Sequence, residues 1–139
     1  MTTRATHEEL YGLNRWGQGY FEVLDNGEVA LRNPMAPDMP AISLPEIIRD
    51  LDKRGIHTPM ILRVGSYLEH AIQQINHGFR DAIERAGYRG TYRGVFPIKV
   101  NQQAQVVDRI VEYGRAYDFG LEAGSKPELV IALAHKLAR

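Results

Sequence analysis

The chain has 139 residues, of which 44% are apolar and 24% are charged, so it is long enough for about one domain with an ordinary core. Its 17 basic residues balance its 17 acidic residues, which argues against a nucleic-acid-binding protein or one that binds an anionic membrane surface. It has no cysteine, no apolar run of about 20 residues and no apolar signal-peptide core. We therefore expect a cytoplasmic protein without disulfides, thiolate metal sites or membrane spans.

The first regular structure is predicted to be a β-hairpin. The runs YFEVL (20–24) and EVALR (28–32) are rich in β-branched and aromatic residues, and Asp-Asn-Gly joins them. The next segment, NPMAPDMPAI (33–42), carries three prolines and is typical of an extended linker. We therefore expect residues 1–42 to form an N-terminal β segment with its linker, and residues 43–139 to form a second part.

From residue 43 onward, helical and strand patterns alternate. Three capping boxes, each a serine followed by a glutamate three residues later, predict helices that begin at Ser43, Ser66 and Ser125. A stripe of apolar residues from Leu68 to Ala86 is typical of a helix that faces a core, and Val106 begins another helical pattern. The strand-like runs are PMILRV (59–64), TYRGVFPI (91–98) and YDFGLE (117–122). This alternation predicts an α/β fold with a parallel sheet and right-handed crossovers.

Three strand–helix units do not close into a complete sheet. A three-stranded parallel sheet leaves an open edge, so we expect these units to belong to a larger barrel or open sheet. The last residues, ELVIALAHKLAR (128–139), are a helical pattern that no Gly, Asn or Pro ends. We therefore expect that the C-terminal part of a larger protein is missing here.

Polar residues follow the predicted strands at the positions where parallel α/β folds carry their chemistry. Arg63 ends the first run, Lys99 and Asn101 follow the second, and Glu122 ends the third. A partly unprotonated lysine amine at such a site is a nucleophile that can form a Schiff base with a carbonyl group. The alternative is a solvated lysine that pairs with a carboxylate, and spacing alone favours this alternative.

Other motifs are weaker. YRGTYRGVF (88–96) mixes arginine with aromatic residues, as RNA-binding segments do, but the balanced charge favours a loop that enters a sheet. GLEAGSK (120–126) differs from a phosphate loop in spacing, and its Ser125 is explained as a helix cap. A helix N-terminus at a strand's carboxyl end is still a plausible anion seat. The five histidines show no metal-binding spacing.

Two of these stretches carry a family resemblance. GVFPIKVNQ (94–102) followed by GLEAGSKPEL (120–129) resembles the biosynthetic arginine decarboxylases of bacteria and plants, and so does the opening stretch YGLNRWGQGYFEVLDNGEV (11–29). The resemblance runs over nearly the whole chain from about residue 10. The shorter motif I-K-V-N (98–101) also resembles the lysine motif of ornithine and diaminopimelate decarboxylases.

The resemblance implies a fold and a chemistry. The fold would be the N-terminal part of a (β/α)8 barrel, preceded by a hairpin that belongs to a β-rich domain. Lys99 would bind pyridoxal 5'-phosphate as a Schiff base, and Glu122 would match an acidic residue near the cofactor, although many relatives have aspartate there. The reaction would convert L-arginine to agmatine and CO2 in putrescine and spermidine biosynthesis, in a Mg2+-dependent homo-oligomer.

Two alternatives stay open. The chain could come from a related decarboxylase that acts on ornithine or diaminopimelate, since no substrate-contacting residue is present to decide. It could also come from a non-catalytic relative that binds partners, although such a protein has no need to keep Lys99 and Glu122. The glycine-rich phosphate loop of the family is not found in these residues, so we expect this chain to be inactive by itself.

Overall fold

The structure, a computed structural model, describes residues 4–135 of the chain, with side chains from residue 7 onward. These residues form a mixed α/β fold that divides into two compact units, with the division between Tyr67 and Leu68. Each unit has its own sheet and its own buried apolar side chains. The predicted boundary at residue 42 concerns the domains of the complete protein and stays a prediction.

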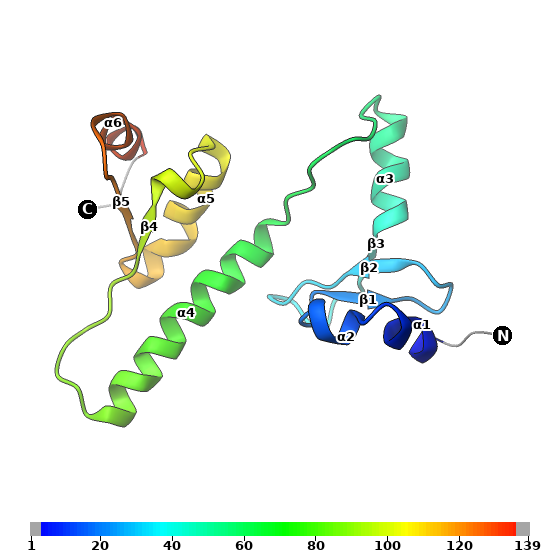
Figure 1. Ribbon diagram of the computed structural model, residues 1–139, viewed down its shortest axis with the longest axis horizontal. Helices are drawn as coiled ribbons and strands as arrows, with labels where there is room; N and C mark the ends of the chain where they lie inside the picture. Colours follow the sequence, from blue (N-terminus) through cyan, green and yellow to red (C-terminus); the bar gives the residue numbers. More distant parts are fainter. Residues whose placement is uncertain (1–3, 136–139) are drawn as a thin grey trace. The chain divides into compact units, whose positions relative to one another are not determined.

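The first unit is built around a small antiparallel sheet (Figure 1). Its elements are α1 (Arg4–Leu10), α2 (Leu13–Trp16), β1 (Phe21–Val23), β2 (Val29–Leu31), β3 (Ile42–Ser43) and α3 (Leu44–Lys53). Val23 of β1 lies opposite Val29 of β2, so the two runs pair as the sequence predicts. Gly27 in the turn has a φ of 84°, a left-handed conformation that glycine adopts without strain.

The proline-rich segment differs from the predicted extended linker. The carbonyl of Asn33 accepts a hydrogen bond from Ala36, and the carbonyl of Ala36 accepts another, so residues 33–39 fold into successive turns. Ile42 and Ser43 then pair with β2 as a third strand. The prediction of an extended linker is therefore wrong, because prolines and an Asn favour turns as readily as extended chain.

The predicted capping box at the start of α3 is confirmed. The Ser43 hydroxyl accepts a hydrogen bond from the Glu46 amide at 3.2 Å, which satisfies one of the free N–H groups of the helix end. The same hydroxyl donates to Glu28 at 2.5 Å, and Glu28 also accepts hydrogen bonds from Arg49. Ser43 therefore joins the hairpin to α3.

Residues 59–64 are not the strand that their apolar pattern predicts. Within the described part of the chain, no strand pairs with them. Ile61 is 78% exposed and Leu62 is 43% exposed, whereas a strand inside a parallel sheet is buried on both faces. The prediction is wrong because a β-strand requires a hydrogen-bonding neighbour as well as a suitable composition.

The second unit contains a parallel strand pair, with α5 beside it (Figure 1). Its elements are the main part of α4 (Gly65–Ala86), β4 (Val95–Pro97), the 3-10 turn η1 (Ile98–Val100), α5 (Ala104–Gly114), the 3-10 turn η2 (Arg115–Tyr117), β5 (Gly120–Glu122) and α6 (Lys126–Ala134). The two strands are the cores of the predicted runs 91–98 and 117–122. Their parallel pairing confirms the predicted strand–helix–strand order.

Apolar residues of α5 and η1 form the core of the second unit. Val107 and Ile110 are buried, as their helical spacing predicts, and Ile98 of η1 is completely buried. α5 contacts β5, and α6 contacts η1. His135 at the end of α6 also forms a 2.6 Å hydrogen bond with Asp108 of α5. These contacts hold the turn after β4 in place.

The long helix α4 is less buried than its apolar stripe predicts. It begins at Gly65, so Ser66 lies inside the first turn and the predicted cap at Ser66 is wrong. Ile72 is buried, but Phe79 of the same stripe is half-exposed. Asn76 is the other buried residue of α4, and its amide donates to the Ile72 carbonyl at 2.8 Å. An apolar stripe shows which face can be buried, but not what covers that face.

Candidate functional site

Lys99 lies just beyond the carboxyl end of β4. The sequence predicts that it ends a strand, but the strand stops at Pro97 and Lys99 is the middle residue of the turn η1. Proline has no N–H group to donate to the hydrogen bonds between strands. The Asn101 amide closes the turn η1 by donating to the Ile98 carbonyl at 3.1 Å. The buried Ile98 fixes the turn, and the Lys99 side chain is exposed.

Glu122 lies at the corresponding end of the neighbouring strand. It is the last residue of β5, it is half-buried, and its register partner in β4 is Pro97, two residues before Lys99. The structure therefore brings both predicted site residues to the same end of the parallel pair. This is the juxtaposition that the alternation of strands and helices predicts.

Glu128 is a third charged residue of this region, which the sequence analysis treated only as part of a capping box. Its carboxylate accepts a hydrogen bond from the Ser125 hydroxyl at 2.7 Å and another from the Gly124 amide at 3.0 Å. The Ser125 hydroxyl in turn accepts from the Glu128 amide at 3.4 Å, so the predicted cap of α6 is confirmed. Glu128 is only 8% exposed.

The environment of Glu128 favours its ionised form. The hydrogen bond from Ser125 lowers its pKa most, and the Gly124 amide lowers it further. Burial opposes these effects, while the positive charge of Lys99 adds to the lowering of the pKa.

Gly124 shows how close the two carboxylates are. A Cβ atom at this position would lie 3.6 Å from the Glu122 carboxylate and 3.8 Å from the Glu128 carboxylate. Both groups therefore flank the β5–α6 turn. The candidate site consists of one exposed amine with a carboxylate at the end of the next strand and a second carboxylate in the first turn of α6.

The other sequence candidates have local explanations. The Asn101 side chain accepts a hydrogen bond from the Gln103 amide at 3.1 Å, which is a turn of the kind that Asn commonly makes. The predicted anion seat at the start of α6 already holds the Glu128 carboxylate. Arg63 belongs to the first unit, in the segment that is not a strand.

Residues 4–135 carry neither a metal-binding cluster nor a membrane-spanning helix. No group of three or more His, Asp or Glu side chains in this range is arranged to hold a metal ion. No helix in the same range is both long and apolar enough to cross a bilayer. The Mg2+ dependence stays an expectation.

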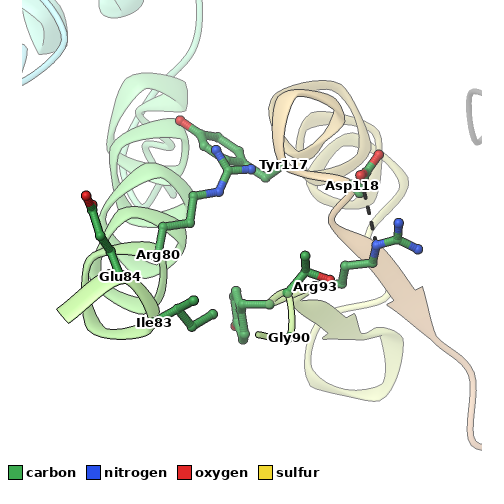
Figure 2. Close-up of a pocket in the computed structure, with 9 residues that line it drawn as sticks. Arg80, Ile83, Glu84, Gly90, Arg93, Tyr117 and Asp118 are labelled. Atoms are coloured by element: carbon green, nitrogen blue, oxygen red, sulfur yellow. Dashed lines mark ion pairs between the residues drawn. The ribbon is translucent and has the colours of Figure 1, made fainter. Parts of the chain in front are cut away.

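A cavity of about 280 Å3 lies at the other ends of the two strands (Figure 2). Its walls come from α4 and from the residues that precede β4 and β5, namely Arg80, Ile83, Glu84, Gly90, Thr91, Tyr92, Arg93, Tyr117 and Asp118. The Arg80 guanidinium lies 5.0 Å from the Tyr117 ring centre, and Arg93 is 4.0 Å from Asp118. Residues 88–94 form a loop that enters β4, in agreement with the interpretation of residues 88–96 as such a loop, whereas the strand predicted from residue 91 begins only at Val95.

The charges of this cavity balance, and they are separate from the lysine site. Two arginines face two acidic residues, so the lining has no excess charge for an anionic ligand. Tyr92 stacks on Phe79 with ring centres 3.9 Å apart, which ties the loop to α4. The cavity precedes the strands, whereas Lys99 follows one of them.

Comparisons with known proteins agree on one family. No family model matches the chain. It is 46% identical over 126 residues to the biosynthetic arginine decarboxylase of Gloeobacter violaceus, a match that covers 91% of this chain and 19% of the relative. It is 43% identical over 132 residues to that of Prochlorococcus marinus strain MIT 9303, covering 95% of this chain and 20% of the relative.

A solved structure agrees. The crystal structure of the biosynthetic arginine decarboxylase SpeA from Campylobacter jejuni matches with a TM-score of 0.81 and 34% identity, over 90% of this chain and 20% of that one. The chain spans about a fifth of the length of the relatives it matches. By sequence and by structure, the chain belongs to the biosynthetic arginine decarboxylases and corresponds to about a fifth of their length.

Proposed function

We propose that this chain is the lysine-bearing portion of an enzyme that converts L-arginine to agmatine and CO2 for putrescine and spermidine biosynthesis. The observation that supports the proposal is the exposed amine of Lys99 beyond the end of β4, next to the strand that ends in Glu122. This arrangement occurs in a chain that resembles arginine decarboxylases over 90% or more of its length.

The residues fit pyridoxal 5'-phosphate as a cofactor. The cofactor has an aldehyde, for which an exposed lysine amine is the matching nucleophile. When bound, it supplies an electron sink for the electron pair left behind when a carboxylate departs as CO2. The Ser125 and Gly124 donors are already used by Glu128, so they are not available for the phosphate.

The roles of the chain's own residues follow from their positions. Lys99 would anchor the cofactor covalently, and its turn, fixed by the buried Ile98, would limit where the amine can reach. Glu122 would place a carboxylate at the end of the neighbouring strand, on the same side of the parallel pair as the turn that carries the amine. Substrate selection would depend on residues of the enzyme outside this portion.

We also propose that the parallel pair is part of a (β/α)8 barrel. Two parallel strands, with α5 between them in sequence and α6 after the second, are compatible with consecutive β/α units of such a barrel. In this proposal residues 1–42 belong to a β-rich domain and residues 43–139 to the barrel. The complete enzyme would be a homo-oligomer.

Reduction with borohydride tests the cofactor role. The full-length protein that contains this chain is incubated with pyridoxal phosphate and reduced, and the modified lysines are mapped by mass spectrometry. We expect the label to concentrate at Lys99 and to disappear in Lys99→Ala, whereas the matched variant Lys53→Ala keeps it, because Lys53 lies in α3 and pairs with Asp50. Label spread evenly over surface lysines would overturn the proposal.

Substrate assays follow from that result. Arginine, ornithine and diaminopimelate are offered to the same protein, and CO2 release and amine products are measured. Agmatine from arginine supports the proposal. Turnover of only ornithine or diaminopimelate would assign the enzyme to a related decarboxylase, and no turnover despite specific labelling of Lys99 would contradict the decarboxylase activity.

A further inference from the structure

The hairpin turn of the first unit carries an asparagine that is followed by glycine. Asn26 and Gly27 are both exposed, and they lie between β1 and β2. The Asn26 side-chain oxygen accepts a hydrogen bond from the Glu28 amide at 3.0 Å, which closes a ring of atoms that contains the Gly27 nitrogen. This hydrogen bond polarises the side-chain carbonyl of Asn26 and holds it beside the peptide group that follows.

The same side-chain turn occurs at two other asparagines, and the residue that follows them differs. Asn33 accepts from the Met35 amide at 3.0 Å, and Asn101 accepts from the Gln103 amide at 3.1 Å. The residue after Asn33 is a proline, whose nitrogen carries no hydrogen, and the residue after Asn101 is a glutamine. Of the three following residues, Gly27 alone combines a backbone N–H with no side chain, and a Cβ atom there would meet nothing within 4 Å.

We propose that the Asn26–Gly27 bond is a site of spontaneous modification, at which the Gly27 nitrogen attacks the side-chain carbonyl carbon of Asn26. The new C–N bond closes a cyclic imide, the attacking nitrogen loses its proton to solvent, and the side-chain nitrogen leaves as ammonia. Water then opens the imide at either carbonyl, which gives aspartate or isoaspartate without any oxidant or reductant. Asparagine is among the thermolabile residues, and this site does not depend on the role of Lys99.

One hydrogen bond of the folded hairpin opposes the reaction. The Gly27 amide donates to the Leu24 carbonyl at 2.8 Å, so its nitrogen can attack only while the turn is open. Asp25, Asn26 and Gly27 are all exposed, and an exposed turn opens at a low cost in free energy. We therefore expect Asn26 to convert in the native protein, but more slowly than in the protein unfolded in urea.

The modification should weaken the connection between the hairpin and α3. Isoaspartate continues the main chain through its side chain, so it lengthens the turn that brings Val23 opposite Val29. The next residue, Glu28, accepts a hydrogen bond from the Ser43 hydroxyl at 2.5 Å, and that hydroxyl caps α3 by accepting from the Glu46 amide. A displaced Glu28 would therefore loosen the cap of α3.

Ageing of the full-length protein tests the site. The protein is incubated at pH 8, and its peptides are mapped by mass spectrometry with fragmentation that distinguishes aspartate from isoaspartate. We expect Asn26 to convert about ten-fold or more faster than Asn101, because a side chain restricts the backbone conformations of the residue that follows. Asn26 should give both products, whereas Asn33 should give no isoaspartate.

Two comparisons make the result decisive. Asn26→Gln keeps a side-chain amide but would need a larger ring, so conversion at this position should be lost. Equal rates at Asn26 and Asn101, or aspartate without isoaspartate at Asn26, would overturn the proposal. Faster conversion of Asn26 in the native protein than in urea would contradict the protection by the Leu24 carbonyl.

Hydrogen exchange tests the consequence for α3. The isoaspartyl form, separated from the unmodified protein, should exchange the Glu46 amide faster, because the Ser43 cap is loosened. Asn26→Asp adds a negative charge without lengthening the main chain, so it should change this exchange less. Equal exchange at Glu46 in the isoaspartyl and unmodified proteins would refute the effect on α3.

Discussion

Replacing glycine by alanine should have opposite effects on stability at two helical glycines, because α5 lies very close to the residue before β5 at one of them. Gly114 ends α5, and a Cβ atom there would lie 2.8 Å from the Cβ of Phe119 and 3.3 Å from its carbonyl oxygen. Both atoms are fixed by the main chain and cannot rotate away. Gly78 of α4 has no atom within 4 Å of the corresponding position.

The magnitudes follow from these distances. At both positions alanine gains about 0.5–1 kcal/mol over glycine from helix propensity and unfolded-state entropy. Gly78→Ala should therefore stabilise the chain by about that amount. At Gly114 the overlap requires a backbone shift, at a cost of about 1–3 kcal/mol. The net effect of Gly114→Ala should be a loss of up to about 2.5 kcal/mol.

Urea unfolding followed by circular dichroism measures both changes in the 139-residue chain. The backbone shift that Gly114→Ala requires should also disturb two hydrogen bonds that set the register of β5. They run from the Phe119 amide to the Gly114 carbonyl and from the Gly120 amide to the Gly94 carbonyl. Amide exchange at Gly120 should therefore speed up in Gly114→Ala and stay unchanged in Gly78→Ala. If Gly114→Ala stabilises the chain as much as Gly78→Ala does, the close approach of α5 to Phe119 is refuted.

Three further predictions concern the core, a cap and the response to pH. Ile98→Ala should lower the free energy of unfolding by about 2–5 kcal/mol, because Ile98 is completely buried. Val100 is 70% exposed, so Val100→Ala should change the free energy of unfolding by less than about 0.5 kcal/mol. Equal urea midpoints for the two variants would contradict this prediction. Ser43→Ala should cost about 0.5–2 kcal/mol in the same assay, and no loss would show that the cap is dispensable. The pKa of Glu28 is lowered from 4.5, mainly by its hydrogen bond from Ser43, and the pKa of Glu128 is lowered from the same value. The two carboxylates therefore contribute fully to stability above about pH 4.5, and this contribution is lost as the pH falls through their folded-state pKa values. Unfolding measured from pH 7 to pH 2 should show this loss, and Glu128→Gln should weaken it.

The sequence was sufficient for the parts of the fold that local chemistry decides. The hairpin, the caps at Ser43 and Ser125 and the helix of Val107 and Ile110 follow from turn residues, capping side chains and helical spacing. The nearness of Lys99 and Glu122 was also predictable, because parallel strands bring their carboxyl ends together. Their chemical roles stay predictions.

Other features depend on contacts between segments that are distant in the sequence, so the local sequence does not predict them. Residues 59–64 have the composition of a strand, but pairing is decided by a neighbouring strand. The displacement of Lys99 into a turn depends on Pro97, whose missing N–H is a signal in the sequence that a strand ends there. Glu128 was visible as the last member of a capping box, but its burial beside the β5–α6 turn arises only when α6 packs against η1.

The capped start of α6 has a consequence for the way a ligand enters. Gly124, Ser125 and Glu128 satisfy one another's hydrogen bonds inside the chain, so the turn takes its shape during folding and needs no ligand to order it. Under the proposed function, a molecule that reaches Lys99 would therefore find this turn already ordered and would not bear the entropic cost of ordering it. We expect hydrogen exchange at the Gly124 and Glu128 amides to stay the same when pyridoxal phosphate is added.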